Sequence, residues 1–359
     1  MKIGIITPAP PRSKYGNRVT ALRWARILKN LGHRVTVSQV YKGGEYDLLI
    51  ALHARRSHPS ISRFHRLHPD KPLVVALTGT DLYRDLKQSN RARESLEIAT
   101  RIVVLQPKAF DDLPPHLYDK TQVIYQSVQP FSSIYKPQTT GRDFTVCVIG
   151  HLRPVKDPFR TALAARRLPP PSKIRVLHVG GAMNDEMAAR ARAEMNVNPR
   201  YRWLDEQSRG RTRRILMQSD LCVLSSRLEG GANVLSEAVV ASVPVIASRI
   251  PGTVGILGAD YPGYFTVGAT CELRRLLIRA ESEPDFLELL RSQIAGLAKL
   301  FEPAREHSAW KDLLGELMRL GLQPNCRPQK HRRASRARRS GNRSGSHTAV
   351  RALEKAMLA

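Results

Sequence analysis

The string SRLEGGANVLSE holds the densest set of residues that could act on a ligand. It combines two glycines, Gly230 and Gly231, with two carboxylates eight positions apart, Glu229 and Glu237. Glycines let the backbone approach a ligand closely, and the helix expected from Asn233, a suitable N-cap, offers free N–H groups to a phosphate. Glu237 could bind a ribose diol, with Glu229 nearer the reacting sugar. The alternative is a glycine turn before a solvated helix, which the paired carboxylates disfavour.

A second string, GHLRPVKDP, places Arg153 and Lys156 three positions apart. Arg can bind a phosphate through two parallel hydrogen bonds, while Lys acts as a point charge. Together they could stabilise a nucleoside diphosphate as it departs from a sugar. In a chain this rich in Arg, a solvated basic loop explains the pair equally well.

Three further groups follow short apolar runs nearer the N-terminus. They are Gly16 and Asn17 in YGNRVTA, His53, Arg55, Arg56 and Ser57 in HARRS, and Thr78, Gly79, Thr80 and Asp81 in TGTD. The two arginines would suit an anionic second substrate, with Ser57 as a possible N-cap. Each group also has an ordinary explanation: the arginines as surface charges, Asp81 as a helix cap and His53 as a structural histidine.

The segments before these strings are predicted strands. In the first half, strands are expected at 2–7, 34–40, 47–52, 72–77, 101–106 and 121–126, and helices at 17–31, 57–68 and 91–99. In the second half, strands are expected at 144–150, 173–180, 221–226 and 244–248, and helices at 158–168, 184–195, 209–219 and 233–242, with two or three more between 270 and 320. Strands that alternate with helices indicate parallel sheets covered on both faces. Ligands bind outside the carboxyl ends of such strands, where the candidate residues fall.

This alternation predicts an α/β protein with two Rossmann-like domains that face each other across a cleft. The expected parts are a first domain at 1–130, a linker at 131–143, a second domain at 144–300, a C-terminal helix at 301–322 that returns toward the first domain, and a basic disordered tail at 323–359. The tail lacks apolar periodicity and is rich in Arg, Ser and Gly.

The 359-residue chain has a formal net charge of +27. The tail holds ten basic residues and one acid, Glu354, so it contributes +9 and leaves +18 in the body. Such a charge is typical of proteins that bind nucleic acid, membrane surfaces or anionic substrates. The tail has no aromatic residue to stack on bases, so specific binding to nucleic acid is not expected, whereas weak nonspecific contact stays open. A nucleic-acid-binding protein is the minor alternative.

Several classes of protein are disfavoured by what the sequence lacks. No window holds the roughly 18 uncharged apolar residues of a membrane-spanning helix, and the N-terminus lacks the long apolar region of a secretory signal. We therefore expect a cytoplasmic protein without stable membrane insertion. Four widely spaced cysteines argue against a disulfide framework or a structural zinc. Without an Asp-x-Asp pair, P-loop, GxSxG, HExxH or GxGxxG after the first strand, we expect neither a metal nor a cofactor.

Taken together, the R-x-x-K loop, the E-x7-E string and the two Rossmann-like domains resemble the retaining, nucleotide-sugar-dependent glycosyltransferases of GT-B fold. In that group the Arg/Lys pair grips the donor diphosphate, the first Glu contacts the donor sugar and the second contacts the ribose. The resemblance assigns these roles to Arg153, Lys156, Glu229 and Glu237, the acceptor to the first domain and the nucleotide sugar to the second. Further donor contacts are expected from Gly16, Asn17, Gly230, Gly231 and Asn233, and acceptor contacts from His53, Arg55, Arg56, Thr80 and Asp81.

Longer strings narrow the resemblance. TPAPPRSKYGNRVTALRWARIL, ALHARRS, VALTGTDLYRDL, HLRPVKDP, SSRLEGGANVLSEA and SRIPGTVGILGADYPGYF are similar to the selenosugar synthases of selenoneine biosynthesis, over about residues 1–320. This implies transfer of a sugar from UDP-N-acetylglucosamine or UDP-glucose to selenophosphate, which gives a 1-selenosugar. A glycosyltransferase that acts on a lipid or polysaccharide hydroxyl is the alternative. Retention and inversion of the anomeric configuration both stay open.

Overall fold

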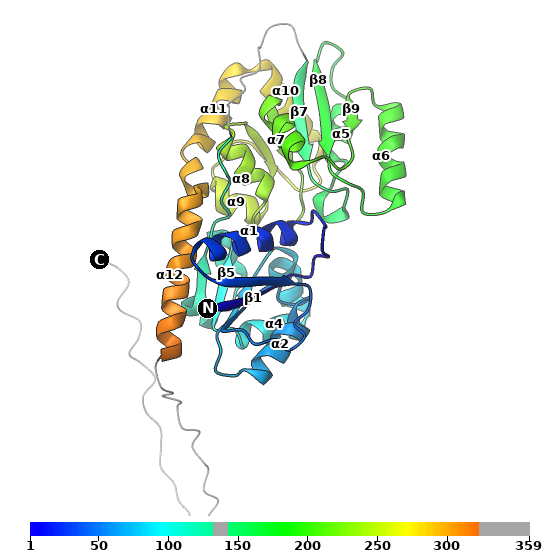
Figure 1. Ribbon diagram of the computed structural model, residues 1–359. Coiled ribbons are helices and arrows are strands. Elements are labelled where there is room, and N and C mark those ends of the chain that lie inside the picture. Colours follow the sequence, from blue (N-terminus) through cyan, green and yellow to red (C-terminus); the bar gives the residue numbers. More distant parts are fainter. Residues whose placement is uncertain (132–142, 323–359) are drawn as a thin grey trace, which may run out of the picture. The chain divides into compact units, whose positions relative to one another are not determined.

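The structure, a computed structural model, describes residues 1–131 and 143–322 and contains two parallel sheets of six strands each (Figure 1). The predicted linker, apart from its two end residues, and the predicted tail lie outside the described residues. We call each sheet, with the helices that connect its strands, a domain. The first domain precedes the linker and the second follows it.

The central strands of the first sheet are apolar over their whole length. The sheet has the order β2 (Arg34–Ser38), β1 (Lys2–Ile6), β3 (Leu48–Leu52), β4 (Leu73–Ala76), β5 (Arg101–Val104) and β6 (Thr121–Val123). Every residue of β3 and β4 is buried, as parallel strands covered on both faces require. The helical segments are α1 (Gly16–Asn30), α2 (His58–Leu67), the π-helical η1 (Asp81–Asp85), α3 (Leu86–Gln88), α4 (Asn90–Glu97), and the 3₁₀ segments η2 (Pro107–Asp112) and η3 (Pro115–Lys120).

The second sheet has the order β12 (Tyr264–Phe265), β11 (Val245–Ser248), β10 (Leu221–Leu224), β7 (Phe144–Ile149), β8 (Ile174–Val179) and β9 (Tyr201–Trp203). Its helical segments are η4 (Pro154–Lys156), α5 (Arg160–Ala165), α6 (Asp185–Val197), α7 (Arg209–Gln218), α8 (Asn233–Val240), α9 (Pro251–Leu257), α10 (Thr270–Ser282), α11 (Pro284–Ala295) and η5 (Ala298–Phe301). Cys147 and Cys222 are free and fully buried on the neighbouring strands β7 and β10, where they pack as small hydrophobic residues.

Each sheet reverses its winding at one place. In the first sheet β1 lies between β2 and β3, and in the second β7 lies between β8 and β10. At such a switch point the connections leave in opposite directions and open a crevice beyond the carboxyl ends of the two strands. The loops after β1, β3, β7 and β10 are therefore the ones that the topology places at binding crevices.

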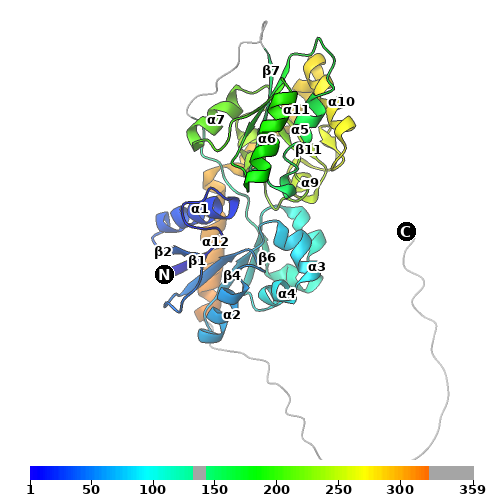
Figure 2. The ribbon, with the colours of Figure 1, turned by 90° about the vertical axis from the view of Figure 1, so that its right-hand side faces the viewer.

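The last described helix, α12 (Pro303–Leu322), follows the second domain in the chain but packs on the first sheet (Figures 1 and 2). Its apolar residues Trp310, Leu313 and Leu317 share a core with Trp24 of α1. The rings of Trp24 and Trp310 meet edge to face, with centroids 4.9 Å apart. The C-terminal helix therefore completes the apolar cover of the first sheet.

The predicted strands are all present, but the structure also contains short elements that the sequence pattern did not predict. Strands β9 and β12 have three and two residues, too few to show a periodicity. Helix α9 starts at Pro251, which suits the first helical turn, inside a stretch without apolar repeat. Ser57 stands at the N-cap position of α2, yet its hydroxyl donates to the Leu52 carbonyl at 2.6 Å and does not cap the helix.

Candidate functional site

A cavity of about 780 Å³ lies between the two domains, at the switch points of both sheets. Its wall comes from the loops after β1, β3 and β4 in the first domain and after β7, β8 and β10 in the second. Nine Lys or Arg side chains and three Glu side chains line the described wall, so positive charge predominates. The volume is in the range of small-molecule sites, and the charge favours an anionic ligand.

The predicted cation pair occupies a fixed turn in this wall. Arg153 precedes η4, Lys156 ends it, and both side chains line the cavity. The hydroxyl of Ser225, just after β10, donates to the carbonyls of Lys156 at 3.1 Å and Asp157 at 2.9 Å. Asp157 has a left-handed φ of 44°, which turns the chain sharply after Lys156. The neighbouring strand thus determines where the two cations lie.

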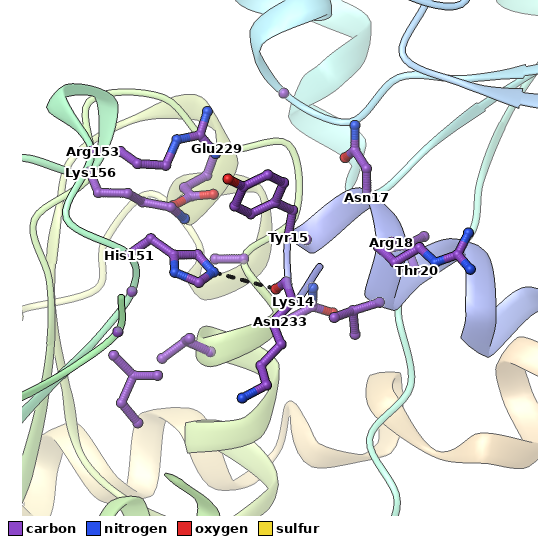
Figure 3. A pocket seen from close by; sticks show the side chains of 18 of the residues that line it. Lys14, Tyr15, Asn17, Arg18, Thr20, His151, Arg153, Lys156, Glu229 and Asn233 are labelled. Carbon is purple, nitrogen blue, oxygen red and sulfur yellow. Dashed lines mark hydrogen bonds and ion pairs between the residues drawn. The ribbon is translucent and has the colours of Figure 1, made fainter. Parts of the chain in front are cut away.

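Glu229 is held by two side chains. Lys156 Nζ forms an ion pair with Oε1, and Ser226 Oγ donates to the same oxygen at 2.6 Å. Ser248 Oγ in turn donates to the Ser226 carbonyl at 2.5 Å. The carboxylate is only 12% exposed and lies with Arg153 and Lys156 on one side of the cavity (Figure 3). The structure therefore brings three predicted residues together from two separate strings.

The start of α8 differs from the prediction. The N-cap position belongs to Ala232, and no side chain caps the helix. Asn233 Oδ1 instead accepts a hydrogen bond from Arg23 Nη1 of the first domain, at 3.1 Å. The predicted N-cap is wrong because this amide is engaged across the cavity. The first N–H groups of α8 consequently stay available at the cavity wall.

Glu237 lines the cavity one helical turn beyond Asn233. Burial raises its pKa above the ordinary value, and the guanidinium groups of Arg209, Arg213 and Arg23 counteract part of that rise. The carboxylate therefore lies in a half-buried, strongly cationic part of the wall. In these surroundings the carboxylate can accept hydrogen bonds from neutral hydroxyl groups of a ligand, while the nearby arginines attract an anionic group of the same ligand.

The two glycines after Glu229 have different surroundings. Gly231 lines the cavity, whereas Gly230 does not and packs against the first domain. A Cβ on Gly230 would lie 2.5 Å from the Thr78 carbonyl carbon and 2.7 Å from the Gly79 nitrogen. The prediction that Gly230 contacts a ligand is thus corrected. Because Gly230 has no side chain, its backbone can pack closely against the backbone of the first domain.

On the first-domain wall, His53 and Thr80 form a hydrogen-bonded pair. The Arg56 N–H donates to His53 Nδ1 at 3.3 Å, which leaves the proton on Nε2 to be donated to Thr80 Oγ1 at 3.2 Å. Burial lowers the pKa of His53, although Asp81 and Asp85 oppose this shift. His53 is therefore neutral near pH 7. The hydroxyl hydrogen of Thr80 stays free to point into the cavity, which His53, Thr80 and Arg56 all line.

Two predicted acceptor residues do not line the cavity. Arg55 Nε pairs with Asp85 at 2.7 Å. Asp81 is fully buried and accepts hydrogen bonds from the N–H groups of Ala54 at 3.1 Å, Thr78 at 2.9 Å and Gly79 at 2.8 Å. Both residues therefore shape the loops after β3 and β4, and of the adjacent arginines only Arg56 faces the cavity.

The segment before α1 crosses to the second domain. Gly16 and Asn17 line the cavity, as do the two residues before them. Lys14 pairs with Glu206 at 2.8 Å, and the ring of Tyr15 meets His151 edge to face, with centroids 5.5 Å apart (Figure 3). This segment thus covers the cavity from the first-domain side.

Sequence reasoning missed several cavity residues. They are Lys14, Tyr15, Arg18, Arg23, His151, Arg209 and Arg213. His151 lies inside the string GHLRPVKDP and could have been found there. The arginines of α1 and α7 carry no local signal, because charged residues on amphipathic helices are ordinarily solvated.

Within residues 1–131 and 143–322, no group of three or more His, Cys, Asp or Glu residues is placed to hold a metal ion. No helix in those ranges is long and apolar enough to cross a bilayer.

Comparison with known proteins agrees with this architecture. Residues 133–294 match the model of the family described as glycosyl transferases group 1. The structure is similar to HepE of Anabaena in complex with UDP and glucose, with a TM-score of 0.69, 16% identity and coverage of 88% of this chain and 100% of that chain. It is also similar to sucrose-phosphate synthase from Thermosynechococcus elongatus, with a TM-score of 0.69, 14% identity and coverage of 89% of this chain and 99% of that chain. A third similar structure is WaaG, a glycosyltransferase involved in lipopolysaccharide biosynthesis, with a TM-score of 0.65, 14% identity and coverage of 87% of this chain and 100% of that chain. No curated sequence matches the chain. The predicted fold, two Rossmann-like domains of GT-B type, is confirmed.

Proposed function

We propose that the protein transfers a sugar from a UDP-sugar, because residues 133–294 match the model of the glycosyl transferases group 1 family. The observation that carries the proposal is the meeting of Arg153, Lys156, Glu229 and Glu237 in one cationic cavity. A nucleotide sugar offers that cavity a diphosphate, a ribose diol and a hexose. Similar proteins are described in complex with UDP-glucose and with UDP and GlcNAc.

In the proposed reaction the bond between sugar C1 and the UDP oxygen breaks. Negative charge then grows on the departing diphosphate, which Arg153, Lys156 and the uncapped N–H groups of α8 stabilise. Glu229, held by Ser226 and Lys156, contacts the donor sugar, and Glu237 binds the ribose. Every one of these interactions uses a protein group that is already in place in the cavity wall.

For the acceptor we propose selenophosphate, and for the donor UDP-N-acetylglucosamine or UDP-glucose. The support is the similarity of the sequence strings together with Arg56 on the acceptor wall. Selenophosphate is an anion with an already nucleophilic selenium, so it needs a cation more than a strong base. Selenium attacks C1 and UDP leaves; water then cleaves the selenium–phosphorus bond, which gives a 1-selenosugar and inorganic phosphate. We expect a neutral His53 to orient Thr80 rather than to take a proton.

A mass-spectrometric assay tests the proposal. Purified protein is incubated with UDP-glucose or UDP-N-acetylglucosamine and with selenophosphate, thiophosphate, or a lipid or polysaccharide hydroxyl acceptor. The expected result is UDP release with a selenium-containing sugar as product, which K156A protein should form far more slowly. Turnover with a hydroxyl acceptor but not with selenophosphate would show that the acceptor belongs to the alternative class, the lipid or polysaccharide hydroxyls. Absence of UDP release with every acceptor would contradict the transferase function itself.

A further inference from the structure

Arg23 of α1 is one of the cavity residues that the proposed function leaves without a task. Its guanidinium reaches out of the first domain, and Nη1 donates to Asn233 Oδ1 at the start of α8, at 3.1 Å. The side chain is 18% exposed and lines the cavity. Arg23 is thus a first-domain cation located at the helix end where the second domain would receive a phosphate.

The guanidinium is oriented by a buried carboxylate. Glu306 of α12 is fully buried at its side chain and accepts hydrogen bonds from Arg23 Nε at 3.2 Å and Trp24 Nε1 at 2.8 Å. Its other oxygen accepts from the Ser127 N–H at 2.9 Å and from the Ser127 hydroxyl. Glu306 thus joins α1, α12 and the segment after β6, and it holds the Nε side of the Arg23 guanidinium.

One donor of this guanidinium remains unused. Arg23 Nη2 is buried and has no hydrogen-bond partner within residues 1–131 and 143–322. Arg23 also lies close enough to Glu237 for its charge to counteract the rise in that carboxyl's pKa. The guanidinium of Arg23 therefore lies at the start of α8, on the cavity wall that also carries Glu237.

On the basis of the proposed function, we infer that Arg23 binds the phosphate attached to the ribose of the nucleotide donor. Because the cation belongs to the first domain, it gives that domain a direct contact with the donor diphosphate bound by the second. A buried donor without a partner is costly, and a phosphate oxygen would satisfy it with a charge-assisted hydrogen bond.

The test compares uridine, UMP and UDP as ligands of the full chain by isothermal titration calorimetry. R23Q should weaken UDP and UMP binding about 10- to 100-fold and change uridine binding less than about twofold. K29Q serves as the matched control, because Lys29 is exposed on the same helix and outside the cavity wall. It should bind all three ligands like the wild type.

R23Q leaves the buried carboxylate of Glu306 without its cation and can lower stability, so R23K is measured as well. Lysine keeps the positive charge but cannot reach Glu306, Asn233 and a phosphate together; it should show a reduced loss of UDP and UMP affinity with a melting temperature near the wild type. Equal weakening of uridine and UDP, or unchanged UDP affinity in both variants, would overturn the assignment of Arg23. Wild-type protein that binds none of the three ligands would overturn the proposed function and this assignment with it.

Discussion

Lys156 and Glu229 form an ion pair on the second-domain side of the cavity, although 73 positions separate them in the sequence. The pair exists because β7 and β10 are neighbours in the second sheet, so the loops that follow them meet. Lys156 therefore has two tasks in the proposed reaction. It fixes the carboxylate that contacts the sugar, and it is in place to neutralise the departing diphosphate.

K156A should lower kcat by about 10²- to 10³-fold, the range seen when one preorganised donor to a developing anion is removed. Steady-state kinetics with the donor established by the transferase assay measure this effect. K173A is the control, since Lys173 is an exposed lysine of the same domain outside the cavity. A wild-type kcat in K156A would refute the role in leaving-group stabilisation.

S226A should lower kcat by about tenfold with little change in the KM of the donor. Ser226 touches Glu229 but does not need to touch the substrate, so its loss frees the carboxylate to adopt other orientations. The readout that separates positioning from folding is the split between kcat and KM, measured beside the melting temperature. A drop in melting temperature without a drop in kcat at 25 °C would show that the hydroxyl is merely structural.

R56A and R55A should differ although the residues are adjacent. R56A removes a cation from the cavity wall and should raise the KM for selenophosphate about tenfold. R55A removes one of the two arginines that pair with Asp85, so we expect a slightly lower melting temperature and a KM within about twofold of the wild type. Equal KM values in the wild type and R56A would exclude Arg56 from acceptor binding.

G230A should impair activity by separating the two domains. The added methyl group would meet the backbone of Thr78 and Gly79, which cannot move without shifting the loop that carries Thr80. We expect kcat/KM to fall more than tenfold. G210A is the control, because a Cβ there meets nothing within 4 Å and alanine favours the helix. Comparable activity of the two variants would show that the interdomain contact is dispensable.

Stability should fall on acidification through the titration of His178. Burial lowers the pKa of His178 to about 4, with Nε2 near the Gly150 carbonyl at 3.0 Å and Nδ1 near the Tyr201 hydroxyl at 3.0 Å. In the unfolded chain His178 has the ordinary pKa of about 6.5, so on acidification the unfolded chain binds a proton before the folded protein does. The free energy of unfolding therefore falls by about 3 kcal/mol between pH 6.5 and pH 4. Urea unfolding of wild type and H178Q at pH 7.5, 5.5 and 4.5 measures this effect. The free energy of unfolding of the wild type, relative to that of H178Q, should fall by about 2.5 kcal/mol from pH 7.5 to pH 4.5. A constant difference would contradict it.

The sequence predicted the main elements because their signals are local. Burial can be predicted from a few consecutive residues, as in the apolar run LLIAL of β3 and the amphipathic repeat of α1. Elements of two or three residues, such as β12 and β9, are held by their neighbours in the sheet and leave no such pattern. The same limit explains why Asn233 was expected to cap α8: its actual partner, Arg23, is 210 positions away.

By itself the sequence determined which loops follow the carboxyl ends of strands, and it made Arg153, Lys156, Glu229 and Glu237, in or just after those loops, candidates to act on a ligand. Only the tertiary structure decided which of the candidates face the cavity. It directs Arg56 into the cavity and ties Arg55 to Asp85, it uses Gly230 between the domains, and it adds Arg23. The physical reason is that strand order and side-chain direction depend on packing between distant segments, which no local pattern encodes.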